Sequence, residues 1–234
     1  MTRVKVCGLT RPEDAELAVE LGAWALGLVF FRASPRACPL EAAEAIGAGL
    51  RRRVEVAGVW VNAPLEEVAR TAERCRLTLL QLHGDEGPAY CREAARRTGC
   101  RVIKAVRVRD ASSVRGLEPF HTDYHLLDAH VPGSHGGTGQ TFNWELARGH
   151  RGRVPVILSG GLDPDSVGEG IRAVTPWAVD SASGTEARPG VKDPARLEAF
   201  FRAVARADGR DAPAEPARPA AAEPAPPAPA GVVP

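Results

Sequence analysis

Short apolar runs alternate with amphipathic stretches along the chain from residue 3 to residue 207. The runs are nearly continuous in apolar residues, a pattern typical of parallel strands that are covered by helices. The predicted strands span residues 3–7, 25–30, 54–60, 78–82, 101–106, 124–128, 154–158 and 177–180. The predicted helices span residues 12–22, 40–50, 64–75, 87–97, 111–117, 143–149, 164–173 and 193–207.

Eight strand–helix units place the fold in the α/β class. Eight units in roughly 200 residues are typical of a single-domain (β/α)8 TIM barrel. An open doubly wound sheet is the alternative, but its glycine fingerprint would follow the first strand, where Cys7-Gly8-Leu9-Thr10 stands instead. We therefore predict one catalytic barrel domain over residues 1–207.

The residues after this domain differ in composition. Segment 208–234 contains eight of the 20 prolines, many alanines and no aromatic residue. Such a segment cannot bury enough apolar surface to offset the entropy lost on ordering. We predict a disordered Pro/Ala-rich C-terminal tail.

Composition limits the classes of binding partner and the cellular compartment that we expect. The chain carries 30 Lys and Arg against 29 Asp and Glu, so its overall charge favours neither nucleic acid nor another polyanion. Its five cysteines form no Cys-x-x-Cys pair, which argues against a disulfide framework and a structural zinc site. No apolar run approaches the roughly 18 residues of a membrane span, and the N-terminus has no apolar signal core. We expect a protein of the reducing cytoplasm that does not bind membranes.

Chemically special residues gather where the predicted strands end. Cys7 ends the first strand, Gln81 and His83 lie at the end of the fourth, and Asp128 ends the sixth. In a (β/α)8 barrel these ends form the rim that carries the chemistry. This clustering favours a functional role for Cys7 over that of a small buried residue.

Glycine-rich segments at the same rim predict a phosphate site. Two glycines follow the seventh strand, a Ser-Ala-Ser-Gly segment follows the eighth, and the long loop after the sixth strand contains four more glycines. Such segments let backbone N–H groups converge on an anion, and the last two loops of barrels are a recurrent phosphate site. The candidate residues are Gly136, Gly137, Gly139, Gly160, Gly161, Ser183 and Gly184.

Seven short motifs occur in order along the chain: KVCGLT, SPR, QLHGDE, IKA, LLDA…GGTGQTFNW, LSGGL and VDSASGTE. Together they resemble the phosphoribosylanthranilate isomerase family of tryptophan biosynthesis, over about residues 3 to 205. The resemblance implies a single-domain barrel, without metal or cofactor. It also implies an Amadori rearrangement of N-(5-phosphoribosyl)anthranilate to 1-(o-carboxyphenylamino)-1-deoxyribulose 5-phosphate. The expected partner is this small phosphorylated substrate, and we expect a monomer or a homodimer.

The resemblance also implies roles for individual residues. Cys7 corresponds to the family's general base, Asp128 to its general acid and Arg36 to the arginine that faces the anthranilate. Gln81 and His83 are candidate substrate-binding residues, although a structural role for His83 fits the sequence equally well. We assign no activating charge to Lys5, and the dipole of the helix that begins near Pro12 is the candidate for stabilising a Cys7 thiolate.

Three other functions remain open. The first two are indole-glycerol-phosphate synthase, for which Lys104 is a possible catalytic lysine, and a dual-substrate sugar isomerase of histidine biosynthesis, in which an aspartate would stand in place of Cys7. The third is a non-catalytic sensor of phosphoribosyl ligands whose tail docks a partner. Such a sensor would have no use for the acid and base pair of Asp128 and Cys7.

Overall fold

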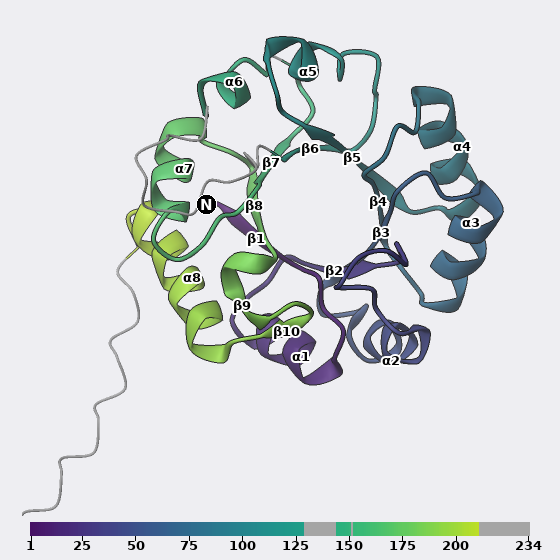
Figure 1. Cartoon of the computed structure of the whole chain (residues 1–234), viewed down its shortest axis with the longest axis horizontal. Coiled ribbons are helices and arrows are strands. Elements are labelled where there is room, and N and C mark those ends of the chain that lie inside the picture. Colours follow the sequence, from purple (N-terminus) through teal and green to yellow (C-terminus); the bar gives the residue numbers. More distant parts are fainter. Residues whose placement is uncertain (129–143, 151, 211–234) are drawn as a thin grey trace, which may run out of the picture.

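Eight parallel strands close into a barrel in the computed structural model, which describes residues 1–128, 144–150 and 152–210. Neighbouring strands pair in chain order, and β1 pairs with β8 to complete the ring (Figure 1). The strands are β1 (Arg3–Cys7), β2 (Ala25–Val29), β3 (Glu55–Trp60), β4 (Leu79–Leu82), β5 (Arg101–Arg107), β6 (Tyr124–Asp128), β7 (Val156–Ser159) and β8 (Ala178–Ser181). The predicted (β/α)8 barrel is confirmed.

Helices surround the strands as an outer layer (Figure 1). They are α1 (Pro12–Glu20), α2 (Leu40–Leu50), α3 (Leu65–Arg74), α4 (Pro88–Thr98), α5 (Ala111–Arg115), α6 (Trp144–Arg148), α7 (Val167–Val174) and α8 (Pro194–Ala207). Within the described ranges, each helix is too short or too polar to cross a bilayer.

Two hydrophobic cores follow from the alternation of side chains along each strand. The larger core lies between strands and helices and includes Val4, Val6 and Leu26. The smaller core fills the barrel interior and includes Ala25, Ala57, Leu79, Ile103, Leu126, Ile157 and Ala178. Positions that face the interior near the C-terminal rim, such as Gln81 and Asp180, are polar instead.

Two predicted elements begin later than the apolar pattern indicates. β7 begins at Val156 rather than at residue 154, because Pro155 has no N–H to donate to a neighbouring strand. α7 begins at Val167 rather than at residue 164. The Asp163 carboxylate accepts hydrogen bonds from the backbone N–H groups of Asp165 and Ser166, and this local turn competes with the helix.

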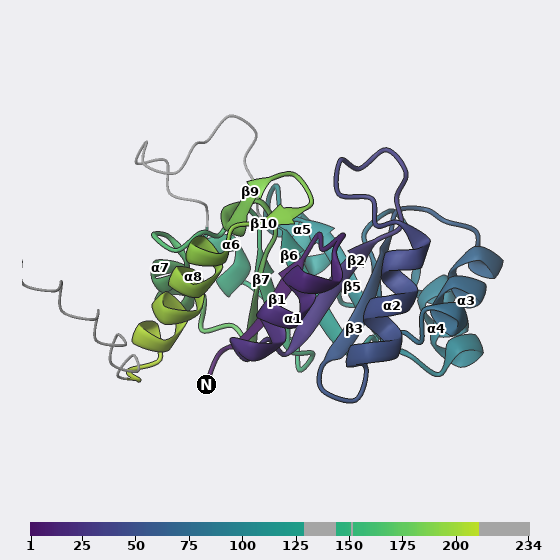
Figure 2. The ribbon, with the colours of Figure 1, turned by 90° about the horizontal axis from the view of Figure 1, so that it is seen from below.

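A short hairpin after β8 was not predicted. A 3-10 turn, η1 (Ser183–Thr185), leads into β9 (Glu186–Arg188) and β10 (Val191–Lys192), which pair antiparallel. The hairpin turns through Gly190, whose φ of +79° favours glycine. Figure 2 shows the hairpin on the side of the barrel away from the N-terminus, which is the side of the C-terminal strand ends. Its strands are too short to give a periodic signal in the sequence.

A buried histidine and a partly buried one pack together outside the barrel at β6. His125 faces outward, is only 3% exposed, and donates from Nε2 to the carbonyl oxygen of Phe120 over 3.0 Å. Its Nδ1 therefore accepts from Nε2 of His150, at 2.8 Å. Burial lowers the pKa of His125 to about 4 and also lowers the pKa of His150. Both rings are neutral in the folded protein at neutral pH.

This pair predicts a loss of stability in mild acid. The unfolded chain binds a proton at His125 below about pH 6.5 and the folded chain only near pH 4, so the free energy of unfolding falls as the pH falls between these values. We expect this residue to contribute about 2–3 kcal/mol to that fall. Urea unfolding at pH 7 and pH 4.5 measures it. His125→Gln should flatten the pH dependence, whereas His121→Gln at an exposed neighbour should not; equal slopes in all three proteins would contradict the assignment.

Candidate active site

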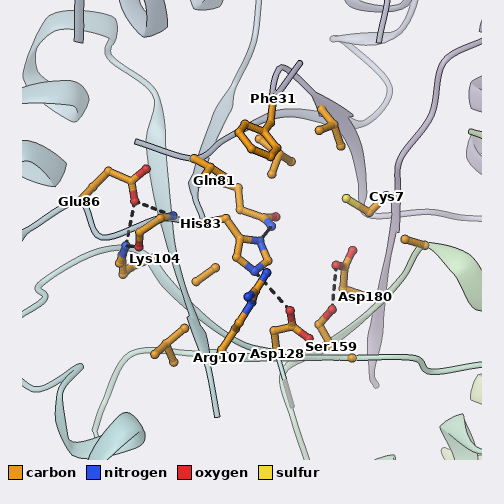
Figure 3. A pocket seen from close by; sticks show the side chains of 18 of the residues that line it. Cys7, Phe31, Gln81, His83, Glu86, Lys104, Arg107, Asp128, Ser159 and Asp180 are labelled. Carbon is orange, nitrogen blue, oxygen red and sulfur yellow. Dashed lines mark hydrogen bonds and ion pairs between the residues drawn. The ribbon is translucent and has the colours of Figure 1, made fainter. Parts of the chain in front are cut away.

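A cavity of about 1200 Å³ opens at the C-terminal ends of the strands (Figure 3). Cys7 lines it from β1, Gln81 from β4, Asp128 from β6 and Asp180 from β8. The strand ends that the sequence marks as chemically special therefore surround one hollow. In Figure 3, Cys7 and Asp128 point into this hollow from different walls.

Asp128 is held by a chain of polar contacts from β4. His83 Nε2 lies 3.4 Å from Asp128 Oδ2, and Gln81 Nε2 lies 3.1 Å from His83 Nδ1 (Figure 3). With the Gln81 amide donating to Nδ1, Nε2 of His83 carries the proton that faces the carboxylate. This arrangement fixes the direction of Asp128, whose side chain is 19% exposed at the cavity wall.

Gln81 also presents an acceptor to the cavity. Its side chain is 1% exposed, and its buried Oε1 has no hydrogen-bond partner among the described residues. A buried amide oxygen is costly without a donor, so a substrate N–H or O–H is the natural complement. The structure thus places both predicted β4 residues, Gln81 and His83, on the cavity wall.

Cys7 is buried at the barrel mouth with only 7% of its surface exposed. Burial raises the pKa of its thiol, and the Lys5 ammonium group opposes this effect. Strict alternation along β1 places Lys5 and Cys7 on the same face, so Lys5, to which no activating charge is assigned from the sequence, lies among the surroundings of the thiol. The five cysteines, Cys7, Cys38, Cys75, Cys91 and Cys100, are all free and buried, which agrees with the expectation of no disulfide framework.

Arg36 lies across the loop after β1 and is held by Glu186 of β9. Its Nε is 2.9 Å from Glu186 Oε1, and its Nη2 is 2.7 Å from Glu186 Oε2. Gly8 makes this path possible, since a Cβ there would lie 2.7 Å from the Arg36 Cδ, and its φ of +78° favours glycine. Glu186 occupies one edge of the guanidinium group. The edge formed by the two Nη atoms remains for a second carboxylate.

The loops after β7 and β8 form one continuous wall of the cavity. Gly160, Gly161 and Ser183 line it, and both glycines have positive φ, at +109° and +73°. Gly184 packs against the β7 loop so closely that a Cβ would lie 2.0 Å from the carbonyl oxygen of Leu162. In the part of the chain that the structure describes, the N–H groups of Gly160, Gly161 and Ser183 donate no backbone hydrogen bond, which suits an anion.

Some predicted features cannot be placed. Gly136, Gly137 and Gly139 lie outside the described residues. Among the residues that are described, no three His, Cys, Asp or Glu side chains are grouped as a metal site requires. The expectation of a site without metal or cofactor stays a prediction.

Lys104, the residue that would suit a synthase, lines the cavity but is held in an ion pair with Glu86. It alternates with Ile103 and Ala105 of the interior core and therefore faces away from the barrel axis. Its Nζ donates to the Gly84 carbonyl oxygen at 2.7 Å and pairs with Glu86 at 3.0 Å. These contacts tie β5 to the loop after β4.

Sequence analysis missed three residues that shape the site: Lys5, Asp180 and Glu186. The position of Asp180 at the end of a strand could have marked it as a site residue. No local feature of the sequence marks Lys5 or Glu186, because their partners Asp180 and Arg36 lie 175 and 150 residues away along the chain.

Comparison with known proteins agrees with this geometry. The family model of N-(5′-phosphoribosyl)anthranilate isomerase matches residues 4–203. The isomerase of Geobacter metallireducens is 50% identical over 202 residues, which are 86% of this chain and 98% of that protein. This chain belongs to the N-(5′-phosphoribosyl)anthranilate isomerase family. It is therefore an isomerase of tryptophan biosynthesis, and the resemblance in the sequence is confirmed.

Solved structures of the same isomerase family share the fold. The crystal structure of phosphoribosylanthranilate isomerase from Thermotoga maritima has a TM-score of 0.79 and 40% identity, covering 89% of this chain and all of that one. A second structure of this isomerase holds reduced 1-(o-carboxyphenylamino)-1-deoxyribulose 5-phosphate, with a TM-score of 0.75 and 37% identity, and again covers 89% of this chain and all of that one. Family membership favours an isomerase over the non-catalytic sensor and the synthase.

Proposed function

We propose that this isomerase rearranges N-(5-phosphoribosyl)anthranilate to 1-(o-carboxyphenylamino)-1-deoxyribulose 5-phosphate with Asp128 as general acid and Cys7 as general base. The observation that carries the proposal is the placement of these two groups on different walls of one cavity (Figure 3). The reaction needs both, because one proton must reach the ring oxygen and another must leave C2′.

The steps follow from the chemistry of the substrate. Asp128 gives its proton to the furanose oxygen, the C1′–O bond breaks, and the lone pair of the anthranilate nitrogen forms a protonated imine with C1′. The Cys7 thiolate then removes the proton from C2′. That electron pair forms the C1′–C2′ double bond while the C1′–N pair returns to nitrogen, which gives a neutral enolamine. Tautomerisation yields the ketone, so all atoms are conserved and no oxidant or reductant is needed.

Arg36 is the proposed contact for the anthranilate carboxylate. Glu186 holds the guanidinium group in place and leaves its two-Nη edge for a bidentate contact. Phe31, whose side chain lines the cavity and is 40% exposed, offers an aromatic face for the anthranilate ring. Gln81 Oε1 is the proposed acceptor for a substrate donor, and His83 positions Asp128.

The wall formed by the β7 and β8 loops is the proposed phosphate site. Backbone N–H groups of Gly160, Gly161 and Ser183 would bind the phosphate oxygens, with Gly184 allowing the two loops to meet. Gly136, Gly137 and Gly139 remain proposed contributors from the loop after β6. With the phosphate at this wall and the anthranilate at Arg36, the ribose carbons would lie between Cys7 and Asp128.

Arg36→Met tests the substrate orientation. We expect the purified wild-type chain to consume N-(5-phosphoribosyl)anthranilate in an anthranilate-fluorescence assay, and the variant to raise KM at least about tenfold with a smaller change in kcat. Arg32→Met is the matched control, because Arg32 lies in the same loop outside the cavity lining, and it should leave both constants unchanged. No turnover by the wild-type chain would refute the proposed function, and a fall in kcat alone would place Arg36 in the chemistry instead.

A further inference from the structure

Lys5 is a fully buried ammonium group that the proposed reaction does not use. Its side chain is 0% exposed and is not part of the cavity lining, so it cannot contact the substrate. It lies two residues before Cys7 on β1 and therefore faces the same barrel interior. On the neighbouring strand β2 the interior position is Gly27, whereas on β8 it is Asp180, so the charge of Lys5 has one direct partner among its neighbours in the barrel wall.

The Lys5 and Cys7 side chains meet above Gly27 of β2. A Cβ built on Gly27 would lie 2.6 Å from Cys7 Sγ and 3.0 Å from Lys5 Nζ. Both atoms thus crowd the same point, and glycine is the residue that leaves room for them. The ammonium group therefore lies near the sulfur but does not line the cavity into which Cys7 points (Figure 3).

Asp180 holds Lys5 in this position. The two residues are direct register partners of β1 and β8, and Lys5 Nζ lies 2.8 Å from Asp180 Oδ1. Asp180 Oδ2 accepts from the Ser159 hydroxyl at 3.2 Å (Figure 3). Burial alone would lower the pKa of Lys5, but the Asp180 carboxylate and Cys7 together outweigh burial and keep the pKa above its ordinary value. The ammonium group therefore stays charged beneath the thiol.

The charged side chains around Cys7 carry one more positive charge than negative charge. Three cationic side chains and two carboxylates gather there, from β1, β8, the β9–β10 hairpin and the loop after β2. They are Lys5, Lys192 and Arg36 with Asp180 and Glu186. Lys192 Nζ also donates to the carbonyl oxygen of Ala182 and lies 3.7 Å from Glu186. A thiolate at Cys7 would balance the charges of this group.

We propose that Lys5 is the positioning residue that favours the thiolate form of Cys7, with Asp180 fixing the ammonium group under the sulfur. This role of Lys5 rests on the proposed function, in which Cys7 must act as a thiolate base. One expected result separates this role from that of a purely structural ion pair between Lys5 and Asp180. Removing the cation and removing the anion should shift the titration of Cys7 in opposite directions.

Iodoacetamide alkylation of the intact protein between pH 5 and pH 10 measures this titration. Peptide mapping by mass spectrometry follows Cys7 separately, and Cys38, Cys75, Cys91 and Cys100 serve as internal references. We expect Lys5→Met to raise the midpoint of Cys7 alkylation by about 1–2 pH units, because an adjacent opposite charge is lost. Lys5→Arg keeps the charge and should restore the midpoint to within half a unit of wild type.

Asp180→Asn should lower the midpoint of Cys7 alkylation, the opposite of the shift expected for Lys5→Met. This second variant keeps the proposal testable if Lys5→Met does not fold. Asparagine keeps an oxygen that accepts a hydrogen bond from Lys5 Nζ but removes the negative charge that disfavours a thiolate at Cys7, so the midpoint should fall below that of wild type. A midpoint unchanged by both Asp180→Asn and every folded Lys5 variant, or a shift in the same direction for both, would overturn the proposal.

Turnover separates this inference from the proposed function. Lys5→Met should lower kcat at neutral pH and leave KM within a few-fold, because Lys5 does not line the cavity. If the alkylation midpoint shifts as expected while Cys7→Ser keeps normal turnover, the base assignment fails and the role of Lys5 in the thiolate stands. If Cys7→Ser is inactive while the midpoint does not move, the role of Lys5 fails alone.

Discussion

Asp128→Asn is expected to lower kcat about a thousandfold, which is about 4 kcal/mol of activation free energy. The amide keeps the shape of the side chain and can still face His83 Nε2, which lies 3.4 Å from the carboxylate. It cannot transfer a proton to the ring oxygen at the required rate. Because the amide fills the same volume, KM should stay within a few-fold of the wild-type value.

Steady-state kinetics with the anthranilate-fluorescence assay decides this prediction. Asp85→Asn is the matched control, since Asp85 is an exposed aspartate that lines the same cavity and bonds only to Asn62 among the described residues. It should keep near-wild-type kcat. If Asp128 merely held the neighbouring loop, asparagine would substitute well and the loss would appear in KM. A variant with a tenth of the wild-type kcat or more would refute the acid role.

Cys7→Ser is expected to lower kcat at least about a hundredfold, the usual effect of a general acid–base group. The hydroxyl is nearly isosteric with the thiol, but it does not ionise near neutral pH even beside Lys5. Phosphate and carboxylate contacts are untouched, so KM should change little. The melting temperature should stay close to that of wild type, because one buried sulfur is replaced by one buried oxygen.

Cys91→Ser provides the control for Cys7→Ser. Cys91 is buried on α4, away from the cavity lining, so its replacement can cost stability but not kcat. A near-normal kcat for Cys7→Ser, with Cys91→Ser also active, would return Cys7 to the role of a small packing residue. Loss of kcat in both variants would instead point to a general effect of serine in the core.

Much of the architecture could be predicted because local patterns determine it. Continuous apolar runs such as residues 101–106 become strands buried on both faces, and the strand count then selects a barrel. A closed barrel brings all strand ends to one rim, so Cys7 and Asp128 could be placed on the same face although they are far apart in sequence. The glycines after β7 were recognised because their backbone freedom is a local property, and positive φ at Gly160 and Gly161 agrees with it.

The electrostatic partners could not be predicted, because they depend on three-dimensional register. Lys5 meets Asp180 only through the pairing of β1 with β8, which closes the barrel. Arg36 meets Glu186 only because a hairpin of five strand residues folds over the rim. Neither contact has a periodic signal, and the alternation that puts Lys5 beside Cys7 becomes informative only once the interior face of β1 is known.

The pH dependence of kcat/KM for wild type and Asp128→Asn tests the central claim most directly. With Cys7 as base and Asp128 as acid, the wild-type profile should be bell-shaped, with two limbs that belong to the pair rather than to either residue alone. In Asp128→Asn the alkaline limb should vanish, and the residual rate should rise to a plateau as the Cys7 thiol ionises. An alkaline limb that persists unchanged in Asp128→Asn would contradict the acid–base assignment.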